Sequence, residues 1–196
     1  MRQRFLFLAA STLAAGMDFG IGMAIASLVT NWFGTHAPWY VLGIGGVLAL
    51  LPDFDLIPSV IRCASPTFDH HQSPFHRPLL VLPISILIAY LFFGQMWAVI
   101  TGICVLAHYI HDTNFISNTY GIAWFWPFSD LYWSPHGLFI SSGNTSHTDW
   151  LQANWLQPSI LSIREITTGL LGVSIALYQS NISVLVICKI LLVVKW

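Results

Sequence analysis

Long runs of apolar residues constrain this chain more than any other feature. The first run, residues 5–31, contains a single charged residue, Asp18. The later runs cover residues 39–51, 79–93, 96–110 and 166–196, and the last is broken at 179–181. A helix needs about 20 mostly apolar residues to cross a membrane. The pattern therefore predicts an all-α protein, a polytopic transmembrane bundle of about 5–6 helices.

Composition agrees with a membrane environment. Hydrophobic residues make up 56% of the 196 positions and charged residues only 8%, whereas a soluble domain carries about 25% charged residues. With a formal net charge of −1, the chain lacks the excess of positive charge that binding to the phosphates of nucleic acid requires. We expect one integral membrane domain over 1–196, with a functional core at about 40–130 and a C-terminal helical hairpin at about 160–196.

The basic residues predict an orientation. If each run crosses the membrane once, the N-terminus, the 52–78 segment and the chain after His111 share one side. The arginines on that side are Arg2, Arg4, Arg62, Arg77 and Arg164, and the loops at 32–38 and 94–95 have no Lys or Arg. This bias marks the shared side as cytoplasmic, in a plasma (inner) membrane. An alternative is that residues 1–16 are a cleaved signal sequence rather than part of the first helix.

Three polar motifs fall on this predicted side. They are Pro52-Asp53-Phe54-Asp55, the segment 69–78 (DHHQSPFHRP) and His108-Tyr109-Ile110-His111-Asp112. Ionisable groups near a bilayer are costly and tend to be functional. If each apolar run crosses the membrane once, all three motifs lie on the same side. We therefore expect them to form one cluster at the cytoplasmic ends of the helices.

The spacing within the motifs suits a metal ion. His108 and Asp112 are four residues apart, on one helix face. His71 and His76 flank Pro74, as in a loop that wraps an ion. The predicted metal ligands are Asp53, Asp55, His71, His76, His108 and Asp112. Imidazole and carboxylate ligands favour zinc first, with manganese, iron or nickel as alternatives. Of Asp53 and Asp55, one can ligate while the other orients a ligand or bridges two ions. The competing interpretation is local, because proline and aspartate also end helices.

Other polar residues have open roles. Asp18 is a further ligand, a partner for Arg77, or the start of a shorter helix. Arg77 suits either a phosphate oxygen or an anchor at the headgroup level. Candidate general bases are Asp69, His70 and His111. We expect His136, His147 and Asp149 to be solvated loop residues, and His36 to lie on the opposite side.

These residues resemble the YdjM-like family of membrane-bound metal-dependent hydrolases. The resemblance covers about residues 40–130 and includes Leu51 to Asp55, His71 to His76, His108 to Asp112, Gly121 and Trp126-Pro127, in the family's order. The chain departs from the family pattern at Gln72-Ser73 and Phe75, and Asp18 stands where the family tends to have a histidine. The resemblance implies a hydrolase without a known substrate.

We therefore predict metal-assisted hydrolysis at the membrane surface. A metal-bound water would attack an amphiphilic, lipid-like ester or phosphoester, such as a phospholipid or prenyl phosphate. The catalytic candidates are Asp69, His70, His111 and Arg77. Two other functions remain open: a transporter of metal ions or protons, and a membrane scaffold in which the metal is structural.

Overall fold

The computed structural model of the protein describes residues 2–55, 73–113, 121–133 and 160–180. The described residues form five α-helices: α1 (Arg2–Trp32), α2 (Trp39–Ala49), α4 (Pro78–Phe93), α5 (Gln95–Asp112) and α7 (Ile160–Gln179). Two short 3-10 helices, η1 (Pro52–Asp55) and η3 (Pro74–His76), follow α2 and precede α4. The only β-type pairing in these ranges is an isolated antiparallel bridge between Ile122 and Trp133. The all-α prediction is confirmed.

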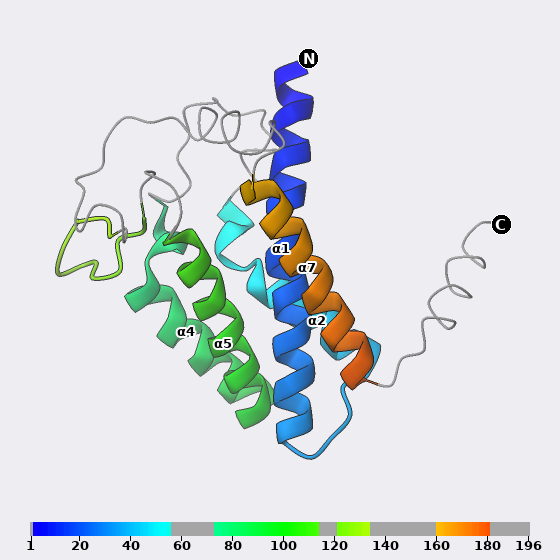
Figure 1. Cartoon of the computed structure of the whole chain (residues 1–196). Coiled ribbons are helices and arrows are strands. Elements are labelled where there is room, and N and C mark those ends of the chain that lie inside the picture. Colours follow the sequence, from blue (N-terminus) through cyan, green and yellow to red (C-terminus); the bar gives the residue numbers. More distant parts are fainter. Residues whose placement is uncertain (1, 56–72, 114–120, 134–159, 181–196) are drawn as a thin grey trace.

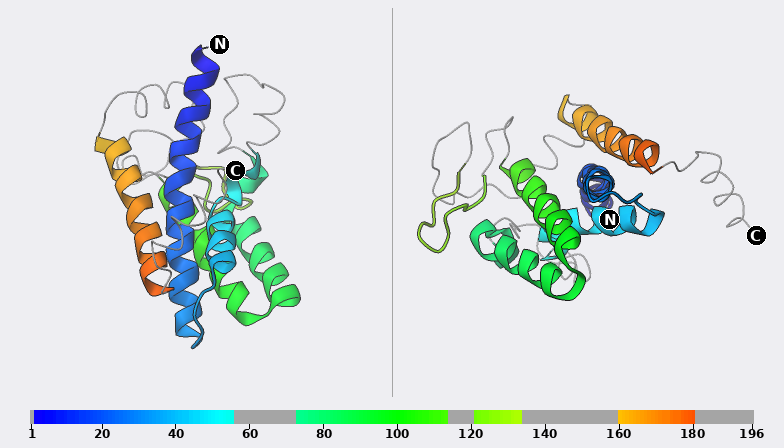
Figure 2. Two further views of the ribbon diagram at one scale, coloured as in Figure 1. Left: turned by 90° about the vertical axis from the view of Figure 1, so that its right-hand side faces the viewer. Right: turned by 90° about the horizontal axis from the view of Figure 1, so that it is seen from below.

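Helix α1 is the centre of the bundle. It packs against α7, α2 and α5, and α4 packs along α5 (Figures 1 and 2). The main core between α1, α2 and α5 includes Ala26, Leu42, Ile100 and Cys104, each almost fully buried. This arrangement brings the middle of α1, the end of α2 and the end of α5 close to one another (Figure 1).

Glycines allow two of these helix pairs to approach closely. A Cβ atom on Gly20 of α1 would lie 2.3 Å from the carbonyl oxygen of Gly169 in α7. A Cβ atom on Gly45 of α2 would lie 2.4 Å from the Cβ atom of Ala26 in α1. No side chain fits at such distances, so these residues set the positions of α2 and α7 against α1.

The helices occupy the predicted apolar runs, but the predicted membrane crossings are not found. No helix in the described ranges is both long and apolar enough to span a membrane. Helix α2 has 11 residues and α4 has 16, whereas a crossing needs about 20. Helix α4 is confined between Pro78 at its first turn and Gly94, which ends it with a φ of 86°. The second half of the predicted C-terminal hairpin lies outside the described residues.

The outer surface of the bundle is strongly apolar. Large hydrophobic side chains on α4 and α7 are more than half exposed: Leu87, Leu91, Phe92, Phe93, Leu170, Leu171 and Tyr178. A monomeric soluble protein rarely exposes apolar side chains in continuous rows along two helices. This surface is suited to an apolar environment.

Candidate metal centre

Two short 3-10 helices present the first part of the site. Helix α2 ends at Ala49, and η1 follows with Asp53 and Asp55. Ser73 joins η1 to η3: its hydroxyl donates to the Asp55 carboxylate and accepts from the backbone N–H of Phe75. This link holds η3 beside η1 and helps to fix the position of His76, whose side chain is fully buried.

Two imidazole nitrogens and two carboxylate oxygens converge on one point at the end of α5. His76 Nε2 lies 3.7 Å from Asp53 Oδ1 and 3.3 Å from Asp112 Oδ2. His108 Nε2 lies 3.6 Å and 2.9 Å from the same two oxygens. The ligand atoms of Asp53, His76 and His108 all lie within 4.8 Å of one another. Two imidazole nitrogens and two carboxylate oxygens therefore face a shared centre of a size that suits one divalent ion.

Each of these histidines faces a second carboxylate with its other ring nitrogen. His76 Nδ1 lies 3.2 Å from Asp55 Oδ2, and His108 Nδ1 lies 3.6 Å from Asp18 Oδ2. Metal-binding histidines commonly have a carboxylate at the nitrogen that does not bind the metal, because it fixes the tautomer and the orientation of the ring. The arrangement fits a nitrogen- and oxygen-ligated metal in both its ligands and their supports.

A further pair extends this network to α7. His111 Nδ1 lies 3.3 Å from Asp18 Oδ1, and His111 Nε2 lies 3.2 Å from Glu165 Oε1. Glu165 is only 2% exposed. Sequence reasoning missed this residue. The available signal was that Arg164 and Glu165 are the only charged residues between positions 160 and 180.

The pKa values reflect an excess of buried acid. Burial raises the pKa of Asp53 to about 6, against the opposing effect of the nearby His108 ring. Burial lowers the pKa of His76, but hydrogen bonds with Asp112 and Asp55 outweigh it and raise that pKa to about 9. Both shifts favour the protonated form, which makes Asp53 neutral and His76 positively charged and so reduces the negative charge of the cluster; a divalent cation would reduce it directly.

Arg77 is held at the edge of the site by aromatic rings. Its guanidinium carbon lies 5.8 Å from the ring centroid of Trp126 and 5.5 Å from that of Tyr132. Cation–π contacts of this kind fix the orientation of the guanidinium group. The 121–133 segment therefore positions the arginine that follows His76.

The structure resolves several alternatives left open by the sequence. Asp18 is in the interior of α1, so the idea that it starts a shorter helix is wrong. His36 lies in the loop between α1 and α2, away from the cluster. Six of the candidate residues fall outside the described part of the chain: Asp69, His70, His71, His136, His147 and Asp149.

Fold and site together define a helical bundle with a strongly apolar outer surface, whose helix ends converge on a buried His/Asp cluster. The family model described as YdjM inner membrane protein matches residues 15–194, so the chain belongs to that family. The resemblance found in the motifs is thereby confirmed, and the family is one of the inner membrane. No curated protein and no solved structure matches the chain.

Proposed function

We propose that this protein is a metal-dependent hydrolase of the inner membrane that acts on an amphiphilic, lipid-like ester or phosphoester. The observation that carries the proposal is the convergence of His76 Nε2 and His108 Nε2 on Asp53 and Asp112. Each of the two histidines also has a carboxylate behind it.

The residues divide into ligands and supports. Asp53, His76, His108 and Asp112 hold the ion, with His71 as a further ligand predicted from the sequence. Asp55 and Asp18 orient the two imidazole rings. A divalent ion at this point, zinc in the first instance, supplies a bound water whose pKa is lowered toward neutrality.

Further side chains have proposed roles beside the ligands. The general base that accepts a proton from the attacking water is Asp69 or His70. His111, the third candidate from the sequence, has a carboxylate facing each ring nitrogen, those of Asp18 and Glu165, which favours the protonated ring; its role is to hold Asp18 in place rather than to accept the proton. Arg77, held over Trp126 and Tyr132, binds a phosphoryl oxygen of the substrate.

Membrane location supports the choice of substrate. The family is one of the inner membrane, and exposed apolar residues line α4 and α7. We propose that these helices contact lipid and that the site opens at the headgroup level on the cytoplasmic side, as the arginine distribution predicts. A site at that level meets the ester and phosphoester groups of lipids.

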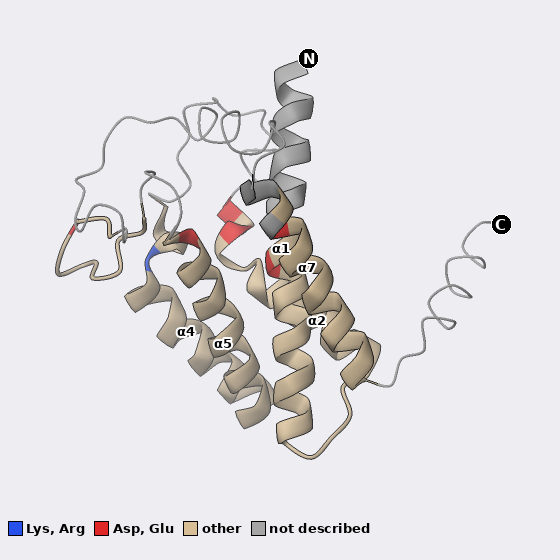
Figure 3. Cartoon of the chain, in the orientation of Figure 1, with Lys and Arg blue, Asp and Glu red and all other residues tan. Residues whose placement is uncertain are grey.

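The position of the acids favours hydrolysis over transport. Figure 3 places the acidic residues of the described helices at the same end of the bundle. A path for ions or protons would be expected to place ionisable groups at several depths. The cluster is instead concentrated at one level, as a catalytic site would be.

Metal content is the first test of the proposal. The protein is purified in detergent, and bound metal is measured by mass spectrometry for wild type, for His108→Ala/Asp112→Ala, and for Asp130→Ala as a control in the 121–133 segment. We expect about one or two ions per chain in wild type and control and a loss in the double variant. Wild type and double variant are then assayed on a panel of lipid esters and phosphoesters. Stoichiometric metal without any turnover would contradict the hydrolase and support a structural metal.

A further inference from the structure

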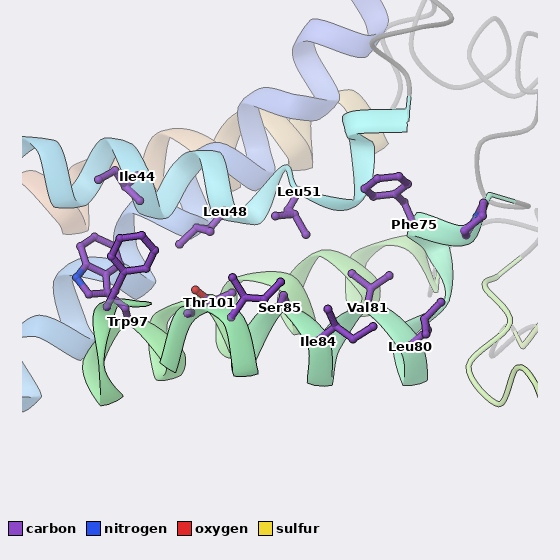
Figure 4. Close-up of a pocket in the computed structure, with 14 residues that line it drawn as sticks. Ile44, Leu48, Leu51, Phe75, Leu80, Val81, Ile84, Ser85, Trp97 and Thr101 are labelled. Carbon is purple, nitrogen blue, oxygen red and sulfur yellow. The ribbon is translucent and has the colours of Figure 1, made fainter. Parts of the chain in front are cut away.

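A large apolar groove lies between α2 on one side and α4 and α5 on the other (Figure 4). Its volume is about 540 Å³, within the range of small-molecule binding sites. Ile44 and Leu48 line it from α2, and Leu80, Ile84 and Ile88 line it from α4. In Figure 4, Ile44 and Leu48 lie across the groove from Leu80 and Ile84.

One end of the groove adjoins the metal centre. Leu51 lines the groove two positions before Asp53, and Phe75 lines it immediately before His76. The backbone carbonyl of Phe75 accepts a hydrogen bond of 2.6 Å from the hydroxyl of Tyr109, the residue after His108. Phe75 lies at one end of the groove in Figure 4, and Ile44 and Trp97 lie at the other. The groove therefore leads away from the ligands along the bundle.

The walls offer almost nothing to a polar ligand. The two hydroxyl-bearing residues in the lining are Ser85 and Thr101. The Ser85 hydroxyl donates to the carbonyl of Leu82 in its own helix, and Thr101 is only 3% exposed. A polar headgroup would lose its hydration in this groove without compensation, whereas an alkyl chain would gain from burial.

The length of the groove also suits a chain. From Leu80 to Phe93, two lining residues of α4, a helix advances by about 20 Å. The groove is therefore long and narrow, with apolar walls and a cluster of metal-ligand side chains at one end.

We propose that this groove binds the alkyl or isoprenoid chain of the substrate, with the ester or phosphoester at the Asp53–His76 end. The inference rests on the proposed hydrolase and adds the site that selects the substrate's chain. Cleavage then takes place at the end of a chain held by α2, α4 and α5. Longer chains bind more tightly, by about fourfold per buried methylene, until the groove is full.

Two tryptophan variants of α4 test the groove. Ile88 lines the groove and is 50% exposed, and its neighbour Leu87 is 55% exposed but does not line it. We expect Ile88→Trp to lower the ratio of kcat/KM for a long-chain over a short-chain ester by at least tenfold, because the indole fills the groove. Leu87→Trp should keep the wild-type ratio. Metal content is measured in both variants to verify that the site is intact.

A readout independent of turnover separates this inference from the proposed function. The purified protein is exposed to a long-chain alkyl phosphate with a diazirine at the chain end, irradiated, and mapped by peptide mass spectrometry. Labelling near Ile44 or Trp97, competed by unlabelled long-chain but not short-chain alkyl phosphate, supports the groove even if no ester is hydrolysed. Labelling elsewhere, or equal ratios in Ile88→Trp and Leu87→Trp, overturns the groove while hydrolysis by wild type leaves the proposed function standing.

Discussion

At the residue scale, the site depends on the use of both ring nitrogens of two histidines. The Nε2 atoms of His76 and His108 face Asp53 and Asp112, and their Nδ1 atoms face Asp55 and Asp18 respectively. If either ring were flipped, so that Nδ1 and Nε2 exchanged places, Nδ1 instead of Nε2 would face the ion. The supporting carboxylates thus determine whether the ligands are pre-organised, and their removal should weaken binding without removing a ligand.

Asp18→Asn tests this support. The amide keeps the size of the side chain but removes the negative charge that faces His108 Nδ1 and His111 Nδ1. We expect the affinity for metal to fall by about 10- to 100-fold, measured by competition with a chelator of known affinity. Asp130→Asn serves as the control and should retain wild-type affinity. Equal affinities for Asp18→Asn and wild type would exclude Asp18 as the support for His108.

Glu165 provides a second residue-scale test. Its carboxylate is buried and lies 3.2 Å from His111 Nε2. Glu165→Ala leaves the partly buried His111 Nε2 without its acceptor, so the free energy of unfolding should fall by about 1–3 kcal/mol. Glu165→Gln, which can still accept a hydrogen bond, should recover part of this loss. Chemical unfolding in detergent measures both, with the exposed Ser174→Ala on the same helix as control. A loss in Ser174→Ala as large as that in Glu165→Ala would contradict the role of the His111 contact.

The sequence predicted the residue types of the site better than their places in it. The four-residue spacing of His108 and Asp112 was sufficient to place both at one centre. The sequence left open which of Asp53 and Asp55 faces the ion, because local spacing does not orient a short 3-10 helix. The isolated charges at Arg164 and Glu165 marked this part of the chain, but the contact of Glu165 with His111 could not be predicted, because it joins positions 54 residues apart.

At the element scale, close helix crossings hold the site together. Helix α2 carries η1, and its distance from α1 is set where Gly45 meets Gly22 and Ala26. A Cβ atom on Gly45 would lie 2.6 Å from the carbonyl oxygen of Gly22, a backbone atom that cannot rotate away. The position of Asp53 therefore depends on Gly45, which lies about two helical turns earlier.

Gly45→Ala and Gly43→Ala are a matched pair in α2. Alanine favours a helix over glycine by up to about 1 kcal/mol, and a Cβ atom on Gly43 would meet nothing within 4 Å. Gly43→Ala should therefore be neutral or stabilising. Gly45→Ala should be destabilised by about 1–3 kcal/mol and should bind metal more weakly, as measured by unfolding and by chelator competition. Equal stability of the two variants would show that the crossing can relax.

Helix boundaries differ from the ends of the apolar runs by a few residues. The fourth apolar run stops at about position 110, but α5 continues to Asp112, as expected for a helix that carries His108 and Asp112 on one face. The last apolar run begins at position 166, but α7 begins at Ile160, where the C-terminal hairpin was expected to start. Charged residues at helix ends mask the boundary, because hydrophobic periodicity stops where the helix becomes polar although its backbone continues.

At the scale of the whole molecule, the centre joins elements that are far apart in the sequence. The proposed ligands come from η1, η3 and α5, and Asp18, the proposed support of His108, comes from α1. A bound ion would neutralise the repulsion between Asp53 and Asp112 and connect these elements. Because the unfolded chain has no such arrangement of ligands, metal binding should stabilise the folded state strongly.

Removal of the metal should therefore lower the stability of the entire bundle. A ligand at 100 times its dissociation constant stabilises a protein by about 2.7 kcal/mol. We expect a chelator to reduce the unfolding midpoint of the wild type, and added metal to restore it. His108→Ala/Asp112→Ala should show no shift with either treatment, because it lacks two of the four central ligands. Asp130→Ala should behave as wild type. If the chelator lowers the midpoint of the double variant as much as that of the wild type, the stabilising ion lies at another site, and the convergence of the four side chains has a different cause.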